Sequence, residues 1–412
     1  MEEERVENKS VFDRVEEAPA DSILGLKTKY LADINPEKVN LGIGAYRDEN
    51  GKPYKLKCVK EAEEIIVEEN LPKEYLPQQG HEGFISKCID LLYGSNHPKK
   101  ENVVGVQTLS GTGGLCVGLN LLHEILPLDT TFYVPEPTWG NHYQVMRRIG
   151  ITQRKSYRYY NPKTISLDFE GMMDDLEKMQ NQSVVLLHLC AHNPTGVDPT
   201  IEQWKQIAEK INKKGHIVFF DNAYQGFASG DLERDAYAIR LFTSTTYDMD
   251  VLCAQSFAKN LGLYGERIGC LSVLCKSQEV KAKLKTRLKL IIRELYSSPP
   301  LHGARIVNEI LSSEKLTNIW KEEMVIMSRR INKMRHVLKS ELERLNTPGN
   351  WDHITSQIGM FTFTGLTAAQ VEKIVKKFSI YMLSNGRISV AGLNESNVRY
   401  VAKAIDYVVR DQ

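Results

Sequence analysis

AQSFAKNLGLYGERIG, residues 254–269, is the stretch from which the fold of this chain is inferred. The apolar run from Val251 to Ala254 predicts a buried strand, and Lys259 follows the carboxyl end of that strand. Open α/β sheets bind ligands at this edge, outside the carboxyl ends of their strands. The stretch therefore favours an α/β fold with a ligand site around Lys259.

Three side chains of this stretch have complementary chemistry. Ser256 precedes Lys259 by three residues, and Arg267 follows it by eight. A hydroxyl and a guanidinium can hold a phosphate, and an amine can form a Schiff base with a carbonyl. Pyridoxal phosphate carries both a phosphate and an aldehyde, so this spacing makes it the candidate cofactor, although a lone lysine is more often a solvated surface charge.

The composition is that of an ordinary globular protein with two domains. The 412 residues are 42% hydrophobic and 25% charged, with a net charge of +1, and a chain of this length exceeds a single core. No basic excess indicates a nucleic-acid partner, and no apolar run is long enough to span a membrane. The seven cysteines contain no Cys-x-x-Cys pair, so we interpret them as reduced, buried thiols of a reducing compartment.

The N-terminal segment, residues 1–21, contains eight acidic and three basic residues and no apolar core. This pattern is typical of neither a secretory signal nor an Arg-rich transit peptide. It favours a cytoplasmic location, although a presequence removed from a longer precursor is compatible with it. We expect the segment to be disordered unless a partner subunit holds it.

Polar residues follow two more predicted strands, over 184–189 and 217–220, which flank a helix in a βαβ unit. Asn193 follows the first strand, and Asp221 and Tyr224 follow the second. These side chains therefore lie at the same sheet edge as Lys259. A carboxylate that ends a buried strand needs a partner, and a protonated pyridine nitrogen would supply one for Asp221.

Two further segments have roles that spacing alone leaves open. Ser110, Gly111 and Thr112 precede an apolar helix over 115–125, and they suit a phosphate or plain N-capping equally well. Trp139 lies on a Pro-rich loop after a short strand, where it can stack on a flat ring or pack in the core.

Three other features are weaker signals. Gly44 allows a ligand to approach the backbone closely, and Tyr75 on a Pro/Gly loop is by itself more typical of a surface aromatic residue. His188 and His192 follow a strand instead of sharing a helix face, so no zinc site, and no other metal site, is expected.

The C-terminal half predicts a second, smaller domain. A strand over 270–274 and a helix over 278–295, which carries Arg293, lead into a long charged helix over 314–345. A compact α+β unit follows. Its predicted elements are strand 360–364, helix 367–378, strand 380–383, strand 387–391 and helix 395–410.

Besides residues 254–269, the chain contains the motifs GIGAYR (42–47), YLP (75–77), LSGT (109–112), PTWGNH (137–142), HNPTG (192–196), DNAYQG (221–226), SSPP (297–300) and GRI (386–388). By these motifs it resembles the class-I aminotransferases, which are pyridoxal-phosphate enzymes of fold type I, and within them most closely the aspartate aminotransferases, from about Phe12 to the C-terminal helix. The sequence departs from the family pattern at Ala258, where many relatives have serine, and at Ser298, where asparagine is common.

This resemblance implies an α/β fold of two domains. The large cofactor-binding domain would comprise residues 49–320, with a mostly parallel seven-stranded sheet sandwiched by helices. Residues 15–48 and 321–412 would form the smaller α+β domain, and residues 1–14 an N-terminal arm.

The resemblance also implies roles in catalysis. Lys259 would bind pyridoxal 5'-phosphate covalently and, once released by substrate, shuttle the substrate α-proton. Asp221, supported by His142, would keep the ring nitrogen protonated. Tyr224 would tune the cofactor through its phenolic oxygen, and Trp139 would stack on its ring. The other cofactor-binding residues implied are Ser110, Gly111, Thr112, Asn193, Ser256, Arg267 and, from the other subunit, Tyr75.

Substrate binding follows by the same resemblance. Arg387 would bind the α-carboxylate, helped by Asn193, Trp139 and the Gly44 backbone. Arg293 would reach from the neighbouring subunit to the distal carboxylate, which makes a homodimer obligatory. The implied reaction is ping-pong transfer between L-aspartate and 2-oxoglutarate, giving oxaloacetate and L-glutamate.

Two alternatives stay open at this stage. An aromatic-amino-acid aminotransferase of the same subgroup can keep Arg293 and swing it aside. A non-catalytic pyridoxal-phosphate-binding regulator would lack Lys259 or Arg387, or carry an appended DNA-binding domain.

Overall fold

The computed structural model describes residues 10–18 and 22–411. Its central sheet consists of β2 (Val103–Leu109), β3 (Phe132–Glu136), β4 (Arg154–Arg158), β7 (Val184–His188), β8 (Ile217–Asn222), β9 (Val251–Ser256) and β10 (Ile268–Leu274). Within the described residues these seven strands lie in the order β2-β10-β9-β8-β7-β3-β4. Among these seven strands β10 alone runs in the opposite direction, so its pairs with β2 and β9 are antiparallel and the other pairs are parallel. The predicted mostly parallel seven-stranded sheet is therefore confirmed.

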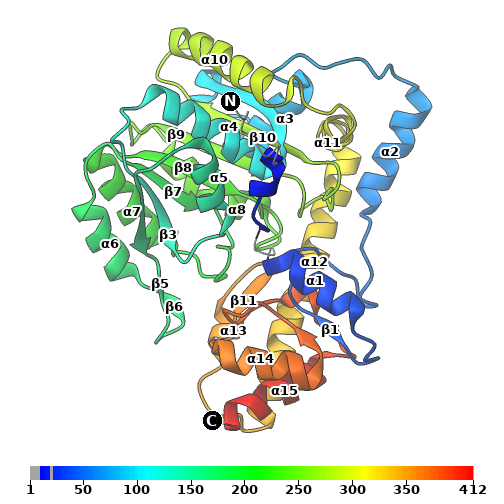
Figure 1. Ribbon diagram of the computed structural model, residues 1–412. Coiled ribbons are helices and arrows are strands. Elements are labelled where there is room, and N and C mark those ends of the chain that lie inside the picture. The colour runs from blue at the N-terminus through cyan, green and yellow to red at the C-terminus, as the bar shows by residue number, and fades with distance from the viewer. Residues whose placement is uncertain (1–9, 19–21, 412) are drawn as a thin grey trace, which may run out of the picture.

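Helices cover both faces of this sheet (Figure 1). Along β7, Val184 and Leu186 pack on one face, and Val185 and Leu187 pack on the other. Because both faces are buried, the strand reads as a continuous apolar run. One face carries α4 (Ser110–Ile125), α5 (Asn141–Ile149) and α10 (Gln278–Tyr296), and the other carries α3 (Glu82–Tyr93), α6 (Phe169–Lys178), α7 (Ile201–Lys214) and α9 (Tyr237–Phe242).

A smaller unit lies below the sheet in Figure 1, and the long helix α12 (Glu314–Arg344) enters it. Its N-terminal part pairs with its C-terminal part, because β1 (Val39–Asn40) lies parallel to β12 (Ile380–Tyr381). Its other elements are α1 (Ser22–Ala32), α13 (His353–Ser356), β11 (Phe361–Phe363), α14 (Ala368–Phe378), β13 (Arg387–Ser389), the 3-10 turn η3 (Val390–Gly392) and α15 (Val398–Arg410).

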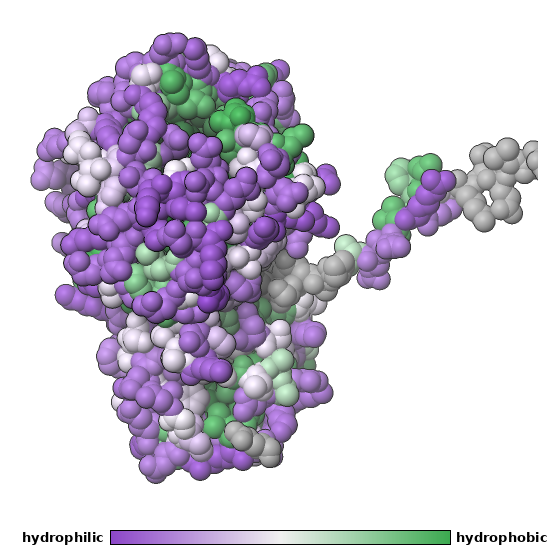
Figure 2. All heavy atoms as spheres, turned by 90° about the vertical axis from the view of Figure 1, so that its left-hand side faces the viewer, coloured by the Kyte–Doolittle hydropathy of each residue, from purple (hydrophilic) through white to green (hydrophobic). Residues whose placement is uncertain are grey.

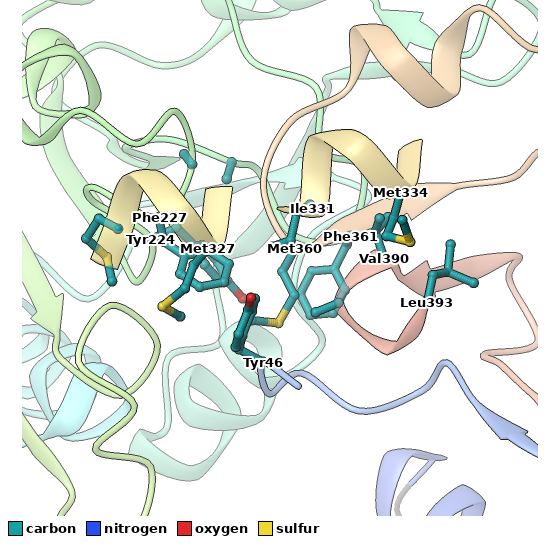
Figure 3. Close-up of a cluster of buried hydrophobic side chains, with 14 of the residues drawn as sticks. Tyr46, Tyr224, Phe227, Met327, Ile331, Met334, Met360, Phe361, Val390 and Leu393 are labelled. Atoms are coloured by element: carbon teal, nitrogen blue, oxygen red, sulfur yellow. The ribbon is translucent and has the colours of Figure 1, made fainter. Parts of the chain in front are cut away.

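An apolar cluster joins the smaller unit to the rest of the chain. Met327, Ile331 and Met334 of α12 pack with Tyr224 on one side and Met360 on the other (Figure 3). The same cluster extends to α2 (Lys57–Glu69) and α11 (His302–Ser312). Helix α12 is therefore the packing link between the sheet and the smaller unit.

The remaining elements lie at the surface or connect the larger ones. They are η1 (Val11–Arg14), η2 (Lys100–Asn102), β5 (Tyr160–Asn161), β6 (Ser166–Leu167) and α8 (Leu232–Asp235). Residues 10–18 project away from the body of the molecule (Figure 2), and the side chains of Val11, Phe12 and Val15 are exposed. No helix of the described residues is long and apolar enough to cross a membrane.

Several predicted element bounds were wrong. The helix predicted over 115–125 begins at Ser110, because its glycines let it pack close to the sheet: a Cβ on Gly114 would lie 2.9 Å from the Cβ of Ala254. The strand predicted over 387–391 ends at Ser389. The last helix begins at Val398 instead of residue 395, because the Asn394 side chain accepts the backbone N–H groups of Ser396 and Asn397 in a turn.

Candidate active site

A cavity opens at the carboxyl ends of the parallel strands. His188 ends β7, Asp221 lies at the end of β8, and Ser256 ends β9. The N-terminus of α4 closes the same edge, because Leu109 of β2 leads directly into Ser110. The cavity is lined by Gly44, Ser110, Gly111, Thr112, Trp139, His188, Asn193, Asp221, Ala223, Tyr224, Ser256, Lys259, Arg267, Phe361 and Arg387. The structure therefore brings together most of the residues that the sequence singled out.

A hydrogen-bonded relay runs behind the buried carboxylate of Asp221. His142 Nε2 lies 2.9 Å from Asp221 Oδ2, and His142 Nδ1 lies 2.7 Å from the hydroxyl of Thr138. The same hydroxyl is 3.3 Å from His188 Nε2. His142 was expected to support Asp221, whereas the hydroxyl bridge to His188 was not foreseen.

The relay keeps Asp221 ionised. Burial raises the pKa of Asp221, but the hydrogen bond and charge of His142, together with His188 and Lys259, outweigh it, so the pKa lies below its usual range. Burial lowers the pKa of His188 to about 3, and the nearby His142 adds to this effect. The site thus presents a carboxylate backed by a neutral His188.

Lys259 faces the cavity three residues after β9 and is partly buried. Burial lowers the pKa of its amine, and the charge of Arg267 acts in the same direction, whereas Asp221 opposes it. Its Nζ lies 5.6 Å from the ring centroid of Tyr224. A lowered amine pKa favours the neutral form, which is the form that attacks a carbonyl.

Two hydroxyls, a guanidinium and a helix N-terminus converge at one end of the cavity. The hydroxyls of Ser110 and Ser256 lie 2.8 Å apart. Ser110 and Arg267 both have left-handed backbone conformations, with φ of 60° and 52°, which are costly for non-glycine residues. The first residues of α4 add the positive end of the helix dipole. This end of the cavity can hold a phosphate.

Arg387, from β13, lies at the opposite side of the cavity and is 3% exposed. Its Nη1 donates to Asn193 Oδ1 at 3.1 Å, and its Nη2 donates to the Gly42 carbonyl at 3.3 Å. Among the described residues these bonds use one N–H of each terminal nitrogen, and Nε is buried, so one N–H on each terminal nitrogen remains for a ligand. Burial lowers its pKa to about 10, so the side chain stays cationic at neutral pH and can pair with a carboxylate.

Tyr75 and Arg293 do not join this cavity within the chain. The Tyr75 side chain is 92% exposed, and Arg293 is exposed near the end of α10, where its Nη1 donates to the Ser297 hydroxyl at 2.6 Å. Neither residue lines the cavity. Their predicted roles would require a second subunit.

Ala223 and Phe361 are cavity residues that the sequence did not single out, and Phe361 is the larger of the two. The side chain of Phe361 contacts two of the predicted site residues. Its ring lies 4.1 Å from the guanidinium carbon of Arg387 and makes an edge contact with the ring of Tyr224. An apolar residue in a short strand of the smaller unit carries no local signal of a binding role. Its position follows from the packing of β11 beside β13.

The residues present fit pyridoxal phosphate. Among the described residues, only one carboxylate oxygen of Asp221 receives a hydrogen bond, so the other can meet a protonated ring nitrogen. Ser110, Ser256 and Arg267 suit its phosphate, and the Lys259 amine suits its aldehyde. Trp139 is placed at the cavity wall, edge-on to His142.

Comparison with known proteins gives one consistent family. Residues 36–405 match the model described as aminotransferase class I and II. The chain is 48% identical to mitochondrial aspartate aminotransferase of Gallus gallus over 403 residues, which is 97% of this chain and 95% of the relative. It is 49% identical to cytoplasmic aspartate aminotransferase of Dictyostelium discoideum over 397 residues, covering 96% of this chain and 90% of the relative.

A solved aminotransferase structure has the same fold as this chain. It is an aromatic-amino-acid aminotransferase of Burkholderia pseudomallei, covalently bound to pyridoxal phosphate. It superposes with a TM-score of 0.94 at 40% identity, covering 97% of this chain and all of that chain. A chain of the same fold is thus known with pyridoxal phosphate covalently bound.

Proposed function

Because the chain belongs to the aminotransferase class I and II family, we propose that it is an aspartate aminotransferase that uses pyridoxal phosphate. The reaction is reversible ping-pong transfer of the amino group between L-aspartate and 2-oxoglutarate, which gives oxaloacetate and L-glutamate. The single observation that carries this proposal is the meeting of Lys259, Asp221 and Arg387 in one cavity. Relatives named aspartate aminotransferase, 48% and 49% identical over nearly the whole chain, support the substrate.

Cofactor binding is proposed for residues on three sides of the cavity. Pyridoxal phosphate, when bound, supplies an electron sink for the bonds at the substrate α-carbon. Asp221, kept ionised by His142, would hold the proton on the ring nitrogen, and Lys259 would form the covalent bond. The remaining cofactor-binding residues proposed are Ser110, Gly111, Thr112, Trp139, Asn193, Tyr224, Ser256, Arg267 and the partner subunit's Tyr75.

Proton transfer is proposed for Lys259. Once substrate has released the amine from the cofactor, its Nζ would take the proton from the substrate α-carbon. The lowered pKa of Lys259, caused chiefly by burial, supports this role because a neutral amine is required.

Substrate binding is proposed for Arg387 together with the second subunit. The terminal nitrogens of Arg387, each with one N–H group that the described residues leave free, would hold the α-carboxylate beside Asn193, Trp139 and the Gly44 backbone. The partner subunit's Arg293 would bind the distal carboxylate. This arrangement requires a homodimer, which the exposure of Tyr75 and Arg293 supports.

The chain organisation is proposed as predicted from the sequence. Residues 49–320 would form the large domain, residues 15–48 and 321–412 the small domain, and residues 1–14 an arm. Pairing of β1 with β12 supports the assignment of the early residues to the small domain. We also propose a cytoplasmic location, supported by the cytoplasmic relative, although the mitochondrial relative has nearly the same identity.

A substrate panel tests the proposed function. The purified protein, loaded with cofactor, is mixed with aspartate, phenylalanine or tyrosine, and the cofactor absorbance is followed as the amino group is transferred. Aspartate is expected to react with the highest kcat/KM. Preference for phenylalanine or tyrosine would assign the aromatic alternative, and cofactor binding without transfer from any of the three would assign a non-catalytic binding protein.

A further inference from the structure

Helix α12 carries a buried arginine, Arg335. Arg335 is 1% exposed, and among the described residues it forms no ion pair. Its guanidinium instead donates to three backbone carbonyls: Nη1 to Ile354 at 2.9 Å, and Nη2 to Gly359 at 2.8 Å and Phe361 at 2.6 Å. A buried cation is costly unless polar groups compensate it. These carbonyls are its compensation, so the charge and the segment 354–361 hold each other in place.

The held segment ends at a residue of the active-site cavity. Arg335 binds the main chain of Phe361, and the ring of Phe361 lies 4.1 Å from the guanidinium carbon of Arg387. Gly44 lies against the ring, since a Cβ built on Gly44 would lie 3.2 Å from Phe361 Cζ. The ring also meets Tyr224 edge-on, with centroids 6.2 Å apart. The ring therefore has little freedom once its backbone is fixed.

The ring in turn limits the orientation of Arg387. An aromatic ring that stacks on a guanidinium covers the flat face and leaves the N–H groups at its edge free. Arg387 Nε is buried and has no hydrogen-bond partner within the described part of the chain. Two hydrogen bonds, to Asn193 and Gly42, hold the other two nitrogens. The ring adds a contact on the flat face of the guanidinium, which restricts the plane in which a carboxylate must lie.

We propose that Arg335 is a positioning residue for the α-carboxylate site, acting through Phe361 on Arg387. This inference rests on the proposed function only for the identity of the carboxylate. Arg335 fixes the backbone of Phe361, Phe361 fixes the plane of Arg387, and Arg387 binds the ligand. Here, relay means this series of contacts from Arg335 through Phe361 to Arg387. Figure 3 shows Phe361 next to Met360, in the same cluster as Ile331 and Met334 of α12.

Three variants of the holoenzyme test this relay: Arg335→Met, Arg335→Lys and Phe361→Leu. The matched control is Arg344→Met, on the same helix, where the arginine is exposed and pairs with Glu341. The readouts are KM and kcat for aspartate, and the Kd of succinate, a dicarboxylate that cannot react, titrated against the cofactor absorbance. We expect Arg335→Met and Phe361→Leu each to raise KM and the succinate Kd by about tenfold, with kcat changed less than about threefold.

Two comparisons separate positioning from general stability. Arg335→Lys keeps the charge and should recover part of the lost affinity. The double variant Arg335→Met with Phe361→Leu should bind succinate no more weakly than the worse single variant, because both changes break one relay. Arg344→Met should leave succinate binding unchanged.

The proposal is overturned if Arg335→Met lowers the melting temperature but leaves the succinate Kd unchanged. If Arg335→Met does not fold, an unchanged succinate Kd in Phe361→Leu overturns it equally. Failure of the wild-type protein to react with aspartate would instead refute the proposed substrate, and the succinate titration would still report on the relay.

Discussion

His142 Nε2 lies 2.9 Å from Asp221 Oδ2, and both side chains are buried beneath the cavity. The pair comes from two separate elements, α5 and the end of β8. Burial alone would favour the neutral carboxyl group, but His142 reverses this effect and keeps the pKa of Asp221 below its usual range. The contact therefore sets the charge that Asp221 presents to the cavity, where we propose that the cofactor ring nitrogen binds.

The first prediction concerns this contact. His142→Asn removes the group that outweighs burial, so the pKa of Asp221 should rise. A carboxylate with a depressed folded-state pKa contributes stability above its unfolded pKa and loses it as the pH falls through the folded value. In the variant this loss should begin at a higher pH. Cofactor absorbance, followed between about pH 4 and pH 8, measures the pH at which this loss begins. The control is His336→Asn, at an exposed position of α12. If the cofactor absorbance is lost at the same acidic pH in the wild type and in His142→Asn, the assigned role of His142 is contradicted.

Lys259 is predicted to carry the covalently bound cofactor. Borohydride reduction followed by peptide mapping should place the label on Lys259 in the wild type and give no label in Lys259→Ala. Turnover of Lys259→Ala should fall by at least about 10³-fold, since both a nucleophile and a proton carrier are lost. Lys276→Ala, at a residue paired with Asp248 on the surface, should behave as the wild type. A label on another lysine would remove the basis of the proposed reaction.

Gly269 is predicted to be essential for the phosphate end of the cavity. A Cβ at this position would lie 2.7 Å from the carbonyl carbon of Ser110 and still closer to the Gln255 carbonyl oxygen. Gly269→Ala should therefore displace Ser110 and cost about 1–3 kcal/mol, which weakens cofactor binding by about tenfold or more. Gly265→Ala is the matched control, because nothing lies within 4 Å of its Cβ. Cofactor titration of both apoproteins gives the comparison, and equal affinities would show that the cavity adapts.

Arg293 is predicted to determine the preference for dicarboxylates. Arg293→Asp would remove the partner of the distal carboxylate and place a like charge there, at a cost of about 3–5 kcal/mol. The kcat/KM for aspartate should fall by about 10²-fold or more, while the cofactor stays bound. Arg287→Asp, on the same helix but paired with Glu124, serves as the control. Unchanged aspartate kinetics in Arg293→Asp would refute this account of specificity.

The last prediction concerns stability and not catalysis. Asp235 is 4% exposed, and burial raises its pKa to about 6 although the backbone N–H groups of Gly226 and Ser229 bind its Oδ2. An acid with a raised folded-state pKa destabilises the fold above that value, by about 3 kcal/mol for a shift from 3.8 to about 6. The protein should therefore gain stability as the pH falls from about 7 to about 5 through this group.

Asp235→Asn should remove that pH dependence. The amide keeps an oxygen acceptor but carries no charge, so the variant should melt at a higher temperature than the wild type at neutral pH. The difference should shrink near pH 5, where Asp235 of the wild type is protonated. Thermal unfolding followed by circular dichroism at the two pH values measures this. A difference that is equal at both values would exclude Asp235 as the titrating group.

The sequence by itself determined the sheet edge and its chemistry. Asp221 and Lys259 follow apolar strands, and parallel strands bring their carboxyl ends to one edge, so spacing alone predicted that these side chains meet. The resemblance assigned site roles to residues of distant segments, such as Ser110 at the start of α4, Trp139 and Arg387 of β13, which the structure places in the same cavity. The bounds of short elements were less predictable, because side-chain turns such as that of Asn394 decide them.

Only the tertiary structure decided the contacts that support these residues. The Thr138 bridge between His142 and His188 joins segments that are separate in the chain, and no local pattern marks it. In the sequence, Arg335 is a charged residue of a predicted helix and Phe361 an apolar residue of a predicted strand. Packing joins them, because Arg335 binds the main-chain carbonyl of Phe361 and the Phe361 ring contacts the Arg387 guanidinium. Burial and neighbouring charges, which together set the direction of the pKa shifts of Asp221 and Lys259, are likewise properties of the assembled chain. Local sequence specifies which groups are present, and long-range packing specifies their environment.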